Sequence, residues 1–371
     1  MIGEKELQEL VDFRTEESSV LSLYLNVDPT QRTKDEYRLT LKSMLKEVAD
    51  EASTKDLAEV EKYFDFQYDW QGKGVVIFSC LEEDFWRAYP LAVPVGNHVF
   101  VADSPYIKSL TDILDEYGRY AVIVVDREGA RFLLFHQGEL EETDGTLGEE
   151  VKRTKRGGGS AAGRLGGLTA RTSRHEEEIA QRNLKEAAEL AVRFCGGGRC
   201  SRIVLGGTDE TLTQFQGMLS KELQEKVVGS ISLDMTASET EVLDRSLEVI
   251  QEVERERKEE LVEQLITAAT SKGGHGALGL DDTLAAVQEG RAHILVVAEG
   301  YVAAGYGCQN CGYIAAHELK ECPFCGGEMA QIEDAVNTIV RKAIESGMEV
   351  EVVKDCATLE EAGSIGAILR Y

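Results

Sequence analysis

Two cysteine pairs near the C-terminal end of the 371-residue sequence have the spacing of a metal site. Each pair reads Cys-x-x-Cys-Gly, and ten residues, Gly312–Glu321, separate the pairs. The tight turn directs two thiolates at one point, and the glycine lets backbone amides approach the sulfurs. Four thiolates predict a closed, structural Zn²⁺ site, and the alternative is two redox dithiols. We expect His317, between the pairs, at the surface and not as a fifth ligand. The predicted ligands are Cys308, Cys311, Cys322 and Cys325.

A second stretch, residues 151–175, combines glycine with positive charge and contains no acid, although the whole chain carries a formal net charge of -27. Glycines at positions 157, 158, 159, 163, 166 and 167 deny it a stable helix or strand, because fixing each one costs backbone entropy. A flexible basic loop on an acidic protein predicts an anionic target, first of all a phosphate backbone. Its cations are Lys152, Arg153, Lys155, Arg156, Arg164, Arg171 and Arg174.

Two other interpretations apply to this glycine-rich loop. A nucleotide-binding loop requires a glycine followed by lysine and a hydroxyl residue, and no glycine here has these neighbours. A disordered linker is the second alternative, but the seven cations without an acid favour an RNA-probing loop. In that case the glycines allow backbone amides to approach the target.

The remaining cysteines and histidines give weaker signals. Cys195 and Cys200 bracket a Gly-Gly-Gly-Arg sequence, which predicts buried thiols at a turn. Four isolated histidines have no serine or cysteine partner suggested by the sequence, so a hydrolase triad is not supported. These are His98, His136, His275 and His293.

Composition limits the class of protein. With 43% hydrophobic residues the chain is globular, with two or three domains, and no apolar run reaches the roughly 18 residues of a membrane span. The acidic, amphipathic N-terminus is not a signal peptide, so we expect a cytoplasmic protein with reduced thiols. The negative net charge excludes non-specific coating of DNA, and any RNA contact should be local.

The periodicity of apolar residues predicts an α/β (α+β) fold with three α/β domains, the third carrying an inserted zinc ribbon at 308–325. The N-terminal domain, residues 1–118, combines strands at 20–27, 75–78 and 99–102 with helices at 35–52 and 104–117. The central domain, 119–237, begins with a hairpin of 121–126 and 130–136, and the basic loop 151–175 follows. Ser173 and Glu176 then have the spacing of a capping box that begins a helix.

The rest of the central domain is predicted as strand 203–205, helix 210–226 and strand 230–235. Ser238 and Glu241 repeat the capping-box spacing and begin a long charged helix that ends near 270 and connects two domains. The third domain, 238–371, continues with helices 280–288 and 335–346 and strands 293–297, 350–353 and 366–370.

The order of these pieces resembles the archaeal and eukaryotic class-1 peptide chain release factors and their paralogue Pelota, across nearly the whole chain. The tip motif of that family is Arg-Gly-Gly-Gln-Ser-Ala. Here Arg156-Gly157-Gly158-Gly159-Ser160-Ala161 stands in the same place, after a hairpin and before a long helix. Three other stretches are similar to the family: SLYLNVDP at 22–29, LGLDDTLAAVQEGRAHILVV at 278–297 and GSIGAILRY at 363–371. A zinc ribbon in the third domain is similar to that of archaeal and some bacterial members.

The sequence departs from this family at two positions. Gly159 replaces the catalytic glutamine, and the codon-reading Asn-Ile-Lys-Ser loop, expected near residues 52–55, is absent or truncated. The resemblance implies that Gly157, Gly158 and Gly159 form the catalytic tip, where a backbone amide stabilises charge while water attacks an ester. Gly159 keeps this amide but lacks the side chain that places water.

The resemblance implies a ribosome-binding translation factor that occupies the A site for rescue or hibernation, with the central domain reaching the rRNA of the peptidyl-transferase centre. The third domain would contact a translational GTPase, and we expect neither a membrane nor a DNA partner. One alternative is a true release factor that hydrolyses peptidyl-tRNA in termination. Another is an adaptor that retains the scaffold away from the ribosome.

Overall fold

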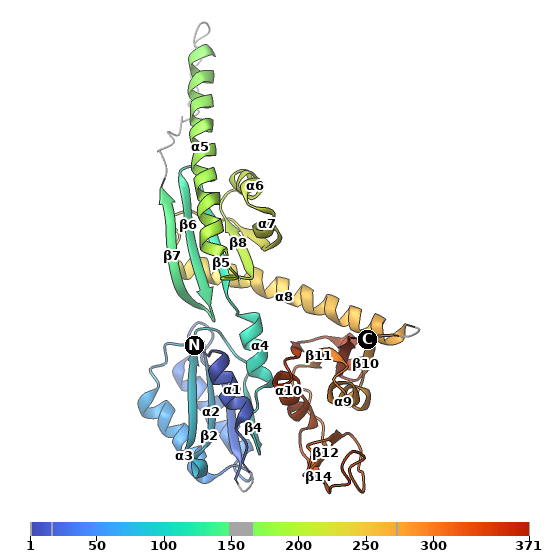
Figure 1. The fold of residues 1–371 in the computed structure, drawn as a ribbon. Coiled ribbons are helices and arrows are strands. Elements are labelled where there is room, and N and C mark those ends of the chain that lie inside the picture. Colours follow the sequence, from blue (N-terminus) through green and yellow to red (C-terminus); the bar gives the residue numbers. More distant parts are fainter. Residues whose placement is uncertain (1, 16–17, 148–165, 272–273, 371) are drawn as a thin grey trace. The chain divides into compact units, whose positions relative to one another are not determined.

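The computed structural model describes residues 2–15, 18–147, 166–271 and 274–370 (Figure 1). The chain divides into two compact units, Met1–Glu116 with Arg255–Tyr371 and Tyr117–Glu254. Helix α8 (Glu239–Thr270) belongs to both, because it begins in the second unit and ends in the first. Both units combine sheets with helices, which confirms the α/β class. The domain boundaries at 118 and 237 remain a prediction. Among the described residues, none of the helices combines the length and apolarity needed to cross a membrane.

The first half of unit 1 is an antiparallel sheet of order β3-β2-β1-β4. Alternate residues Leu21, Leu23 and Leu25 of β1 point to one face, where they pack with Leu41 and Leu45 of α2. The strands are β1 (Val20–Asn26), β2 (Gly74–Cys80), β3 (Phe85–Leu91) and β4 (His98–Ala102). The helices are α1 (Glu4–Asp12), α2 (Lys34–Glu47), α3 (Thr54–Lys62), the π-helix η1 (Tyr63–Gln67), the 3-10 helix η2 (Leu81–Glu83) and α4 (Lys108–Glu116).

The second half of unit 1 contains a sheet of order β10-β16-β11-β15 and a small sheet of order β13-β12-β14. Apolar residues of β11, α10 and β16 form one core cluster, which includes Leu295, Ile339 and Ile365. The strands are β10 (Gly276–Leu278), β11 (Ala292–Ala298), β12 (Gly305–Cys308), β13 (Ile314–Ala315), β14 (Met329–Ile332), β15 (Glu349–Val353) and β16 (Ile365–Leu369). The helices are α9 (Leu280–Gln288), α10 (Ala335–Glu345) and α11 (Ala357–Glu361).

A buried arginine joins the two halves of unit 1. Arg341 of α10 is 0% exposed and donates to the carbonyl oxygens of Leu10 at 3.3 Å and Phe13 at 2.9 Å, and to that of Val11. These carbonyls belong to the end of α1, where a helix has no backbone partners for its last carbonyls. Arg341 therefore satisfies the C-terminus of α1 and holds this helix on α10.

Unit 2 is built on a five-stranded sheet of order β7-β6-β5-β8-β9. The predicted hairpin is confirmed as β5 and β6, and its turn is fixed by Asp126, whose Oδ1 accepts from the amides of Glu128 and Gly129 at 2.8 and 2.9 Å. Strand β8 runs parallel to β5, so the chain between them must cross over the sheet. The strands are β5 (Tyr120–Val125), β6 (Gly129–His136), β7 (Glu139–Leu147), β8 (Arg202–Gly206) and β9 (Val227–Ile231). The helices are α5 (Gly166–Cys195), α6 (Asp209–Met218) and α7 (Lys221–Glu225).

The start of α5 differs from the prediction. We expected Ser173 and Glu176 to begin the helix, but α5 begins at Gly166, so Ser173 lies inside it. Gly166 and Gly167 are helical as well, against the expectation that they prevent regular structure. Extending an existing helix needs no new nucleus, so two glycines at its first turn cost little within 30 helical residues.

Other predicted elements also differ in extent. The helix expected over 104–117 is α4, which begins only at Lys108. The helix expected over 210–226 breaks at Leu219, because the Ser220 side chain accepts from the Leu223 amide and begins α7. The strand expected over 230–235 is β9, which ends at Ile231 before an Asp234 turn. Residues 48–52, expected to continue the helix from 35, follow the end of α2. By contrast, Ser238 begins α8 as expected, since its Oγ accepts from the Glu241 amide at 3.1 Å.

Candidate functional site

The four predicted cysteine ligands come together in the small β13-β12-β14 sheet. Their sulfur atoms all lie within 4.8 Å of one another. The Sγ atoms of Cys308 and Cys325 are 3.4 Å apart, and those of Cys311 and Cys322 are 3.5 Å apart. Four thiolates at Zn–S distances of about 2.3 Å in a tetrahedron have sulfurs about 3.8 Å apart, so the cluster fits this metal closely.

The two halves of the cluster have the same backbone turn. The Gly312 amide donates to the Cys308 carbonyl and the Gly326 amide to the Cys322 carbonyl, each at 2.9 Å. Both glycines have left-handed backbones, with φ of 69° and 71°, a conformation that other residues adopt only with strain. The glycine after each Cys-x-x-Cys sequence is therefore required by the turn that directs the sulfurs.

Backbone amides favour the thiolate form of the first cysteine. The amides of Cys311 and, secondarily, Asn310 approach Cys308 and lower its pKa to about 6. A thiolate is the form of cysteine that binds a metal, so the turn prepares this ligand for binding. His317 lies outside the cluster, as expected, and forms an exposed ion pair with Asp281 at 3.0 Å.

Two polar side chains that the sequence did not indicate hold the cluster against the helices. Gln288, at the end of α9, donates to the Ile314 carbonyl at 2.8 Å and accepts from the Ile314 amide at 2.6 Å. It therefore pairs with β13 as a neighbouring strand would. Lys342 of α10 donates to the Gly312 carbonyl and so places a cation beside the cysteine turn. These side chains connect the ribbon rigidly to the core that contains Ile314.

The predicted basic loop, 151–175, falls in the sequence between two elements of unit 2 only as far as residue 165, and its last ten residues belong to helix α5. Strand β7 ends at Leu147 and helix α5 begins at Gly166. Arg127, in the β5–β6 turn, pairs with Glu177 of α5 at 2.7 Å, and its carbonyl accepts from Asn183 at 3.1 Å. The helix before Glu177 thus continues past the hairpin by about 15 Å, and Figure 1 shows it projecting beyond the sheet.

Most of the predicted tip residues lie outside the described part of the chain. The catalytic assignments Gly157, Gly158 and Gly159 fall in residues 148–165. So do five of the predicted RNA-binding cations, Lys152, Arg153, Lys155, Arg156 and Arg164. Arg171 and Arg174 belong to α5, but their side chains are also outside the description.

Comparisons with known proteins agree on one family. A sequence model described as bacterial archaeo-eukaryotic release factor family 10 matches residues 105–251. Peptide chain release factor subunit 1 of Thermococcus sibiricus is 24% identical over 310 residues, which is 75% of this chain and 72% of the relative. The same factor of Methanocaldococcus jannaschii is 26% identical over 336 residues, 81% of this chain and 79% of the relative. By these matches the chain is similar in sequence to the archaeal/eukaryotic-type release factors.

Solved structures of the family also match. The crystal structure of Archaeoglobus fulgidus Pelota is 14% identical, with 80% of this chain and 79% of that chain covered and a TM-score of 0.37. A crystal structure of an archaeal translation termination factor is 16% identical, with 99% of this chain and 96% of that chain covered and a TM-score of 0.28.

Residues 52–55, where the resemblance predicts the codon-reading loop, have a defined structure. Ser53 ends the connection from α2 to α3, and its side chain accepts from the Lys55 amide at 3.3 Å as a helix cap. Ala52, just before it, is buried. Residues 52–55 therefore contain the N-cap, Ser53, and the first two residues of helix α3, which begins at Thr54.

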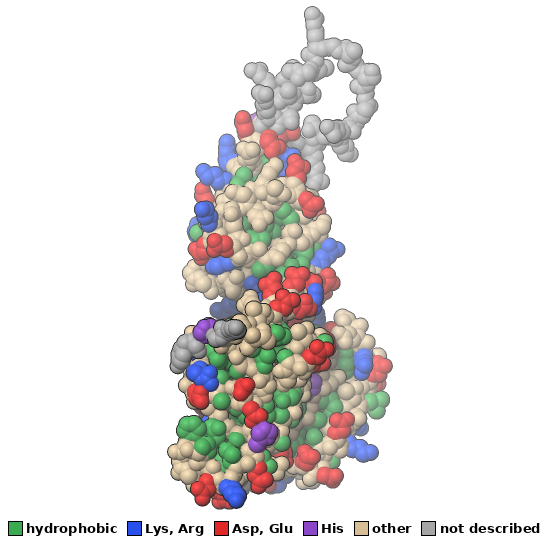
Figure 2. Space-filling model, turned by 90° about the vertical axis from the view of Figure 1, so that its right-hand side faces the viewer, with side chains coloured by type: hydrophobic (Ala, Val, Ile, Leu, Met, Phe, Trp, Pro, Cys, Tyr) green, Lys and Arg blue, Asp and Glu red, His purple; other side chains and the backbone are tan. Residues whose placement is uncertain are grey.

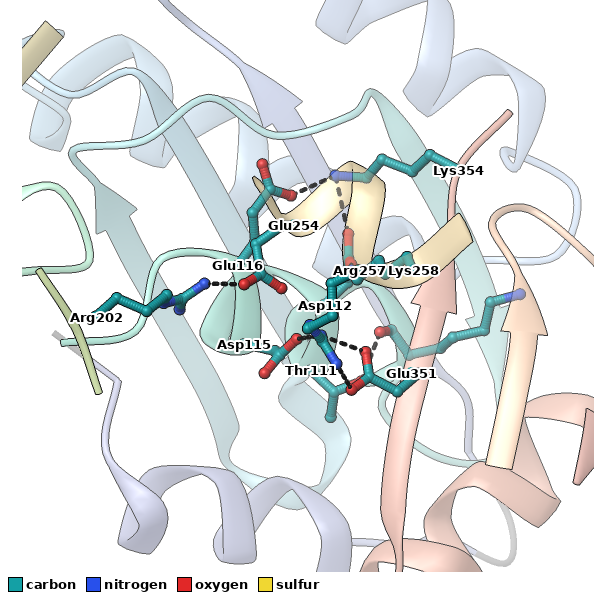
Figure 3. A network of polar contacts seen from close by, with 11 residues as sticks. Thr111, Asp112, Asp115, Glu116, Arg202, Glu254, Arg257, Lys258, Glu351 and Lys354 are labelled. Carbon is teal, nitrogen blue, oxygen red and sulfur yellow. Dashed lines mark hydrogen bonds and ion pairs between the residues drawn. The ribbon is translucent and has the colours of Figure 1, made fainter. Parts of the chain in front are cut away.

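An ion-pair network in unit 1 includes residues close in sequence to Glu116 and Arg255, the two positions where the chain leaves and re-enters this unit. Asp112 of α4, with a side chain 3% exposed, accepts from Lys258 of α8 at 2.6 Å and from Lys354 at 2.9 Å. Lys354 also pairs with Glu116 at 2.7 Å (Figure 3). These two acids hold the pKa of Lys354 well above its usual value, against the opposite effect of burial. The network fixes α4, α8 and the end of β15 within unit 1.

Arg257 extends this network. It donates to both carboxylate oxygens of the buried Glu351 of β15, at 2.6 and 2.8 Å, and to Asp115 of α4 at 2.9 Å. A two-pronged guanidinium–carboxylate contact fixes orientation as well as distance. The chain leaves unit 1 after Glu116 and re-enters it at Arg255. The network therefore holds the chain in unit 1 within a few residues of each of these two positions.

The prediction of buried thiols at Cys195 and Cys200 agrees with the structure. Cys195 and Cys200 are both buried, 0% and 1% exposed, at the end of α5 and before β8. Hydrogen bonding of the Cys195 thiol to the Cys200 sulfur, followed by burial, raises the pKa of Cys195. Burial lowers the pKa of His98, and His136 pairs with Glu141 at 3.2 Å. Neither histidine makes a described contact with a serine or cysteine nucleophile.

Proposed function

We propose that this release factor homologue binds the ribosome in the A site, in place of a tRNA, and acts in rescue or hibernation. The observation that carries the proposal is the tip motif, in which Gly159 replaces the glutamine that the family uses in ester hydrolysis. The motif stands between β7 and the projecting helix α5, so the scaffold that presents it is retained while the reactive side chain is not. A factor that only occupies the site requires the scaffold alone.

The segment at the codon-reading position supports the same proposal. Stop-codon reading in the family depends on an Asn-Ile-Lys-Ser loop, whereas here Ala52 is buried and Ser53 is engaged as the cap of α3. The side chains of Ala52 and Ser53 are therefore used within the fold, and a role that needs no stop codon is the simpler proposal.

In this proposal the cations of the basic loop contact rRNA phosphates near the peptidyl-transferase centre. The four cysteines bind a structural Zn²⁺, since all four positions are thiols and no ligand position remains for water or substrate. We further propose the domain that carries this ribbon as the contact for a translational GTPase, by resemblance to the family.

A second candidate is peptide release. Gly159 keeps the backbone amide that could stabilise the charge of the transition state, and only the placement of water by a side chain is lost. The relatives at 24% and 26% identity are peptide chain release factors, which favours this candidate.

A release assay separates the two candidates. Ribosomes that carry peptidyl-tRNA and a stop codon are mixed with the protein, and the released peptide is compared with that from an archaeal release factor. We expect little release. Release at a comparable rate, lost in Gly159→Pro, which removes the amide, but kept in Gly163→Pro, would establish hydrolysis instead.

A further inference from the structure

Helix α2 carries a row of cations on its solvent side. Lys34, Arg38, Lys42 and Lys46 follow one another at intervals of four residues, which makes them neighbours on the helix surface. Three of them are exposed and Arg38 is partly exposed, while the opposite side, with Tyr37, Leu41, Met44 and Leu45, is buried. Like charges at this spacing destabilise a helix, and Lys34 in the first turn opposes the helix dipole. The stability of α2 therefore does not account for the row.

The acids near this row neutralise only part of it. Arg38 pairs with Asp65 of η1 at 3.1 Å. Lys42 and Lys46 form no ion pair with any residue that the structure describes. In a chain with a net charge of -27, two neighbouring lysines without an acidic partner are a local exception. They leave positive charge available to an anionic ligand.

Aromatic side chains accompany the cations. The Lys34 ammonium and the Arg38 guanidinium lie over the ring of Trp70, at 5.0 and 5.7 Å from its centre. The π-helix η1 holds Phe66 with 83% of its surface exposed, next in sequence to Asp65. A π-helical turn is rare in proteins and often occurs at a functional site.

Trp70 has an unusual backbone. Its φ of 64° is in the left-handed region, which is a strained conformation for a bulky residue. Its indole nitrogen donates to the Phe64 carbonyl at 3.3 Å, and its ring contacts those of Phe64 and Tyr68. The surrounding structure thus keeps the ring beside the cations despite the strain.

We propose that this basic–aromatic surface, formed by Lys34, Arg38, Lys42, Lys46, Phe66 and Trp70, binds single-stranded RNA. Cations along a backbone path with exposed rings beside them are what single strands require, since phosphates take the charges and bases stack on the rings. The proposal rests on the proposed ribosomal function and adds a second RNA contact, on a different unit from the glycine-rich loop. It does not include residues 52–55, which lie at the start of α3.

The test measures binding of a fluorescent 12-nucleotide oligouridylate by anisotropy over a range of salt concentrations. Changing Lys42 and Lys46 to Gln should weaken binding and flatten the logarithmic salt slope by up to about 1.4. Phe66→Ala should weaken binding about fivefold or more and leave the slope unchanged, because stacking carries no charge. As a charge-matched control, Lys185→Gln with Arg193→Gln on α5 should bind like the unchanged protein.

Unchanged affinity in both the Lys42/Lys46 and Phe66 variants would overturn the proposal. Tighter binding of a polyglutamate peptide than of the oligouridylate would also overturn it, in favour of an acidic protein partner. All these side chains are exposed, so matching thermal unfolding curves establish that the variants are folded. Oligouridylate binding without ribosome binding would support this surface and contradict the proposed function, so the two can fail separately.

Discussion

At the residue scale, the arrangement of the four cysteine sulfurs depends on the glycines beside them in the sequence. The two Cys-x-x-Cys sequences determine the ligands, and Gly312 and Gly326 determine the turns. Gly327 is also restricted, because a Cβ there would lie 3.1 Å from the Cys308 sulfur and 3.3 Å from that of Cys325. The sequence spacing was sufficient to predict that these four cysteines lie together.

Removing one ligand should release the metal. Cys308→Ser leaves three thiolates, so zinc measured by mass spectrometry of the purified protein should fall from about one per chain to nearly none. The ribbon should become susceptible to proteolysis, while the sheets of unit 1 remain folded. Cys356→Ser, which changes a cysteine outside the cluster, should keep its zinc. A full zinc content in Cys308→Ser would refute the assignment.

At the element scale, α4, α8 and β15 are joined by ion pairs, of which the pair between Asp112 and Lys258 is buried on both sides. Asp112 has side-chain exposure of 3% and Lys258 of 8%. A buried ion pair adds little compared with apolar packing, but removing one partner leaves an uncompensated charge. The network therefore makes the arrangement of these three elements sensitive to single substitutions.

Asp112→Ala tests this sensitivity. It leaves Lys258 buried without its carboxylate, and the free energy of unfolding from denaturant titration should fall by about 3–5 kcal/mol. Glu259→Ala on the same helix removes an exposed pair with Arg255, and should cost at most about 0.5 kcal/mol. Equal effects of the two substitutions would mean that the buried network does not stabilise unit 1.

Most elements could be predicted because their apolar period is clear, as in β1, β5 and α10. The helix boundaries that were predicted wrongly have local causes. Ser173 has the spacing of a helix cap but lies within α5, because a long helix extends through residues of low helix propensity. Ser220 caps α7 and so interrupts a helix that apolar periodicity alone would continue. The ion pairs could not be predicted at all, because Asp112 and Lys258 are 146 positions apart in the sequence.

At the scale of the whole molecule, charge is unevenly distributed. Acidic side chains are spread over the face shown in Figure 2, in keeping with the net charge of -27. The residues expected to meet RNA are concentrated in the glycine-rich loop and on α2. Long-range repulsion is screened over about 8 Å at physiological salt, so local basic surfaces can act despite the acidic surroundings.

The charges of the loop should determine the salt dependence of ribosome binding. Replacing Lys155, Arg156, Arg164 and Arg171 with Gln should weaken binding and flatten the logarithmic salt slope by up to about 3 to 4. The matched control replaces four exposed cations elsewhere, Lys5, Lys185, Arg193 and Lys221. If the loop variant keeps its affinity and slope, the loop is a linker and does not touch RNA.

The most direct test of A-site occupancy is co-sedimentation with ribosomes in a sucrose gradient. One ribosome sample has an empty A site, and the other has the same site filled with tRNA. We predict that the protein migrates with the first sample and that filling the site lowers the bound fraction at least about tenfold. Equal binding to both samples would contradict A-site occupancy, and absence of binding to either would contradict a ribosomal function.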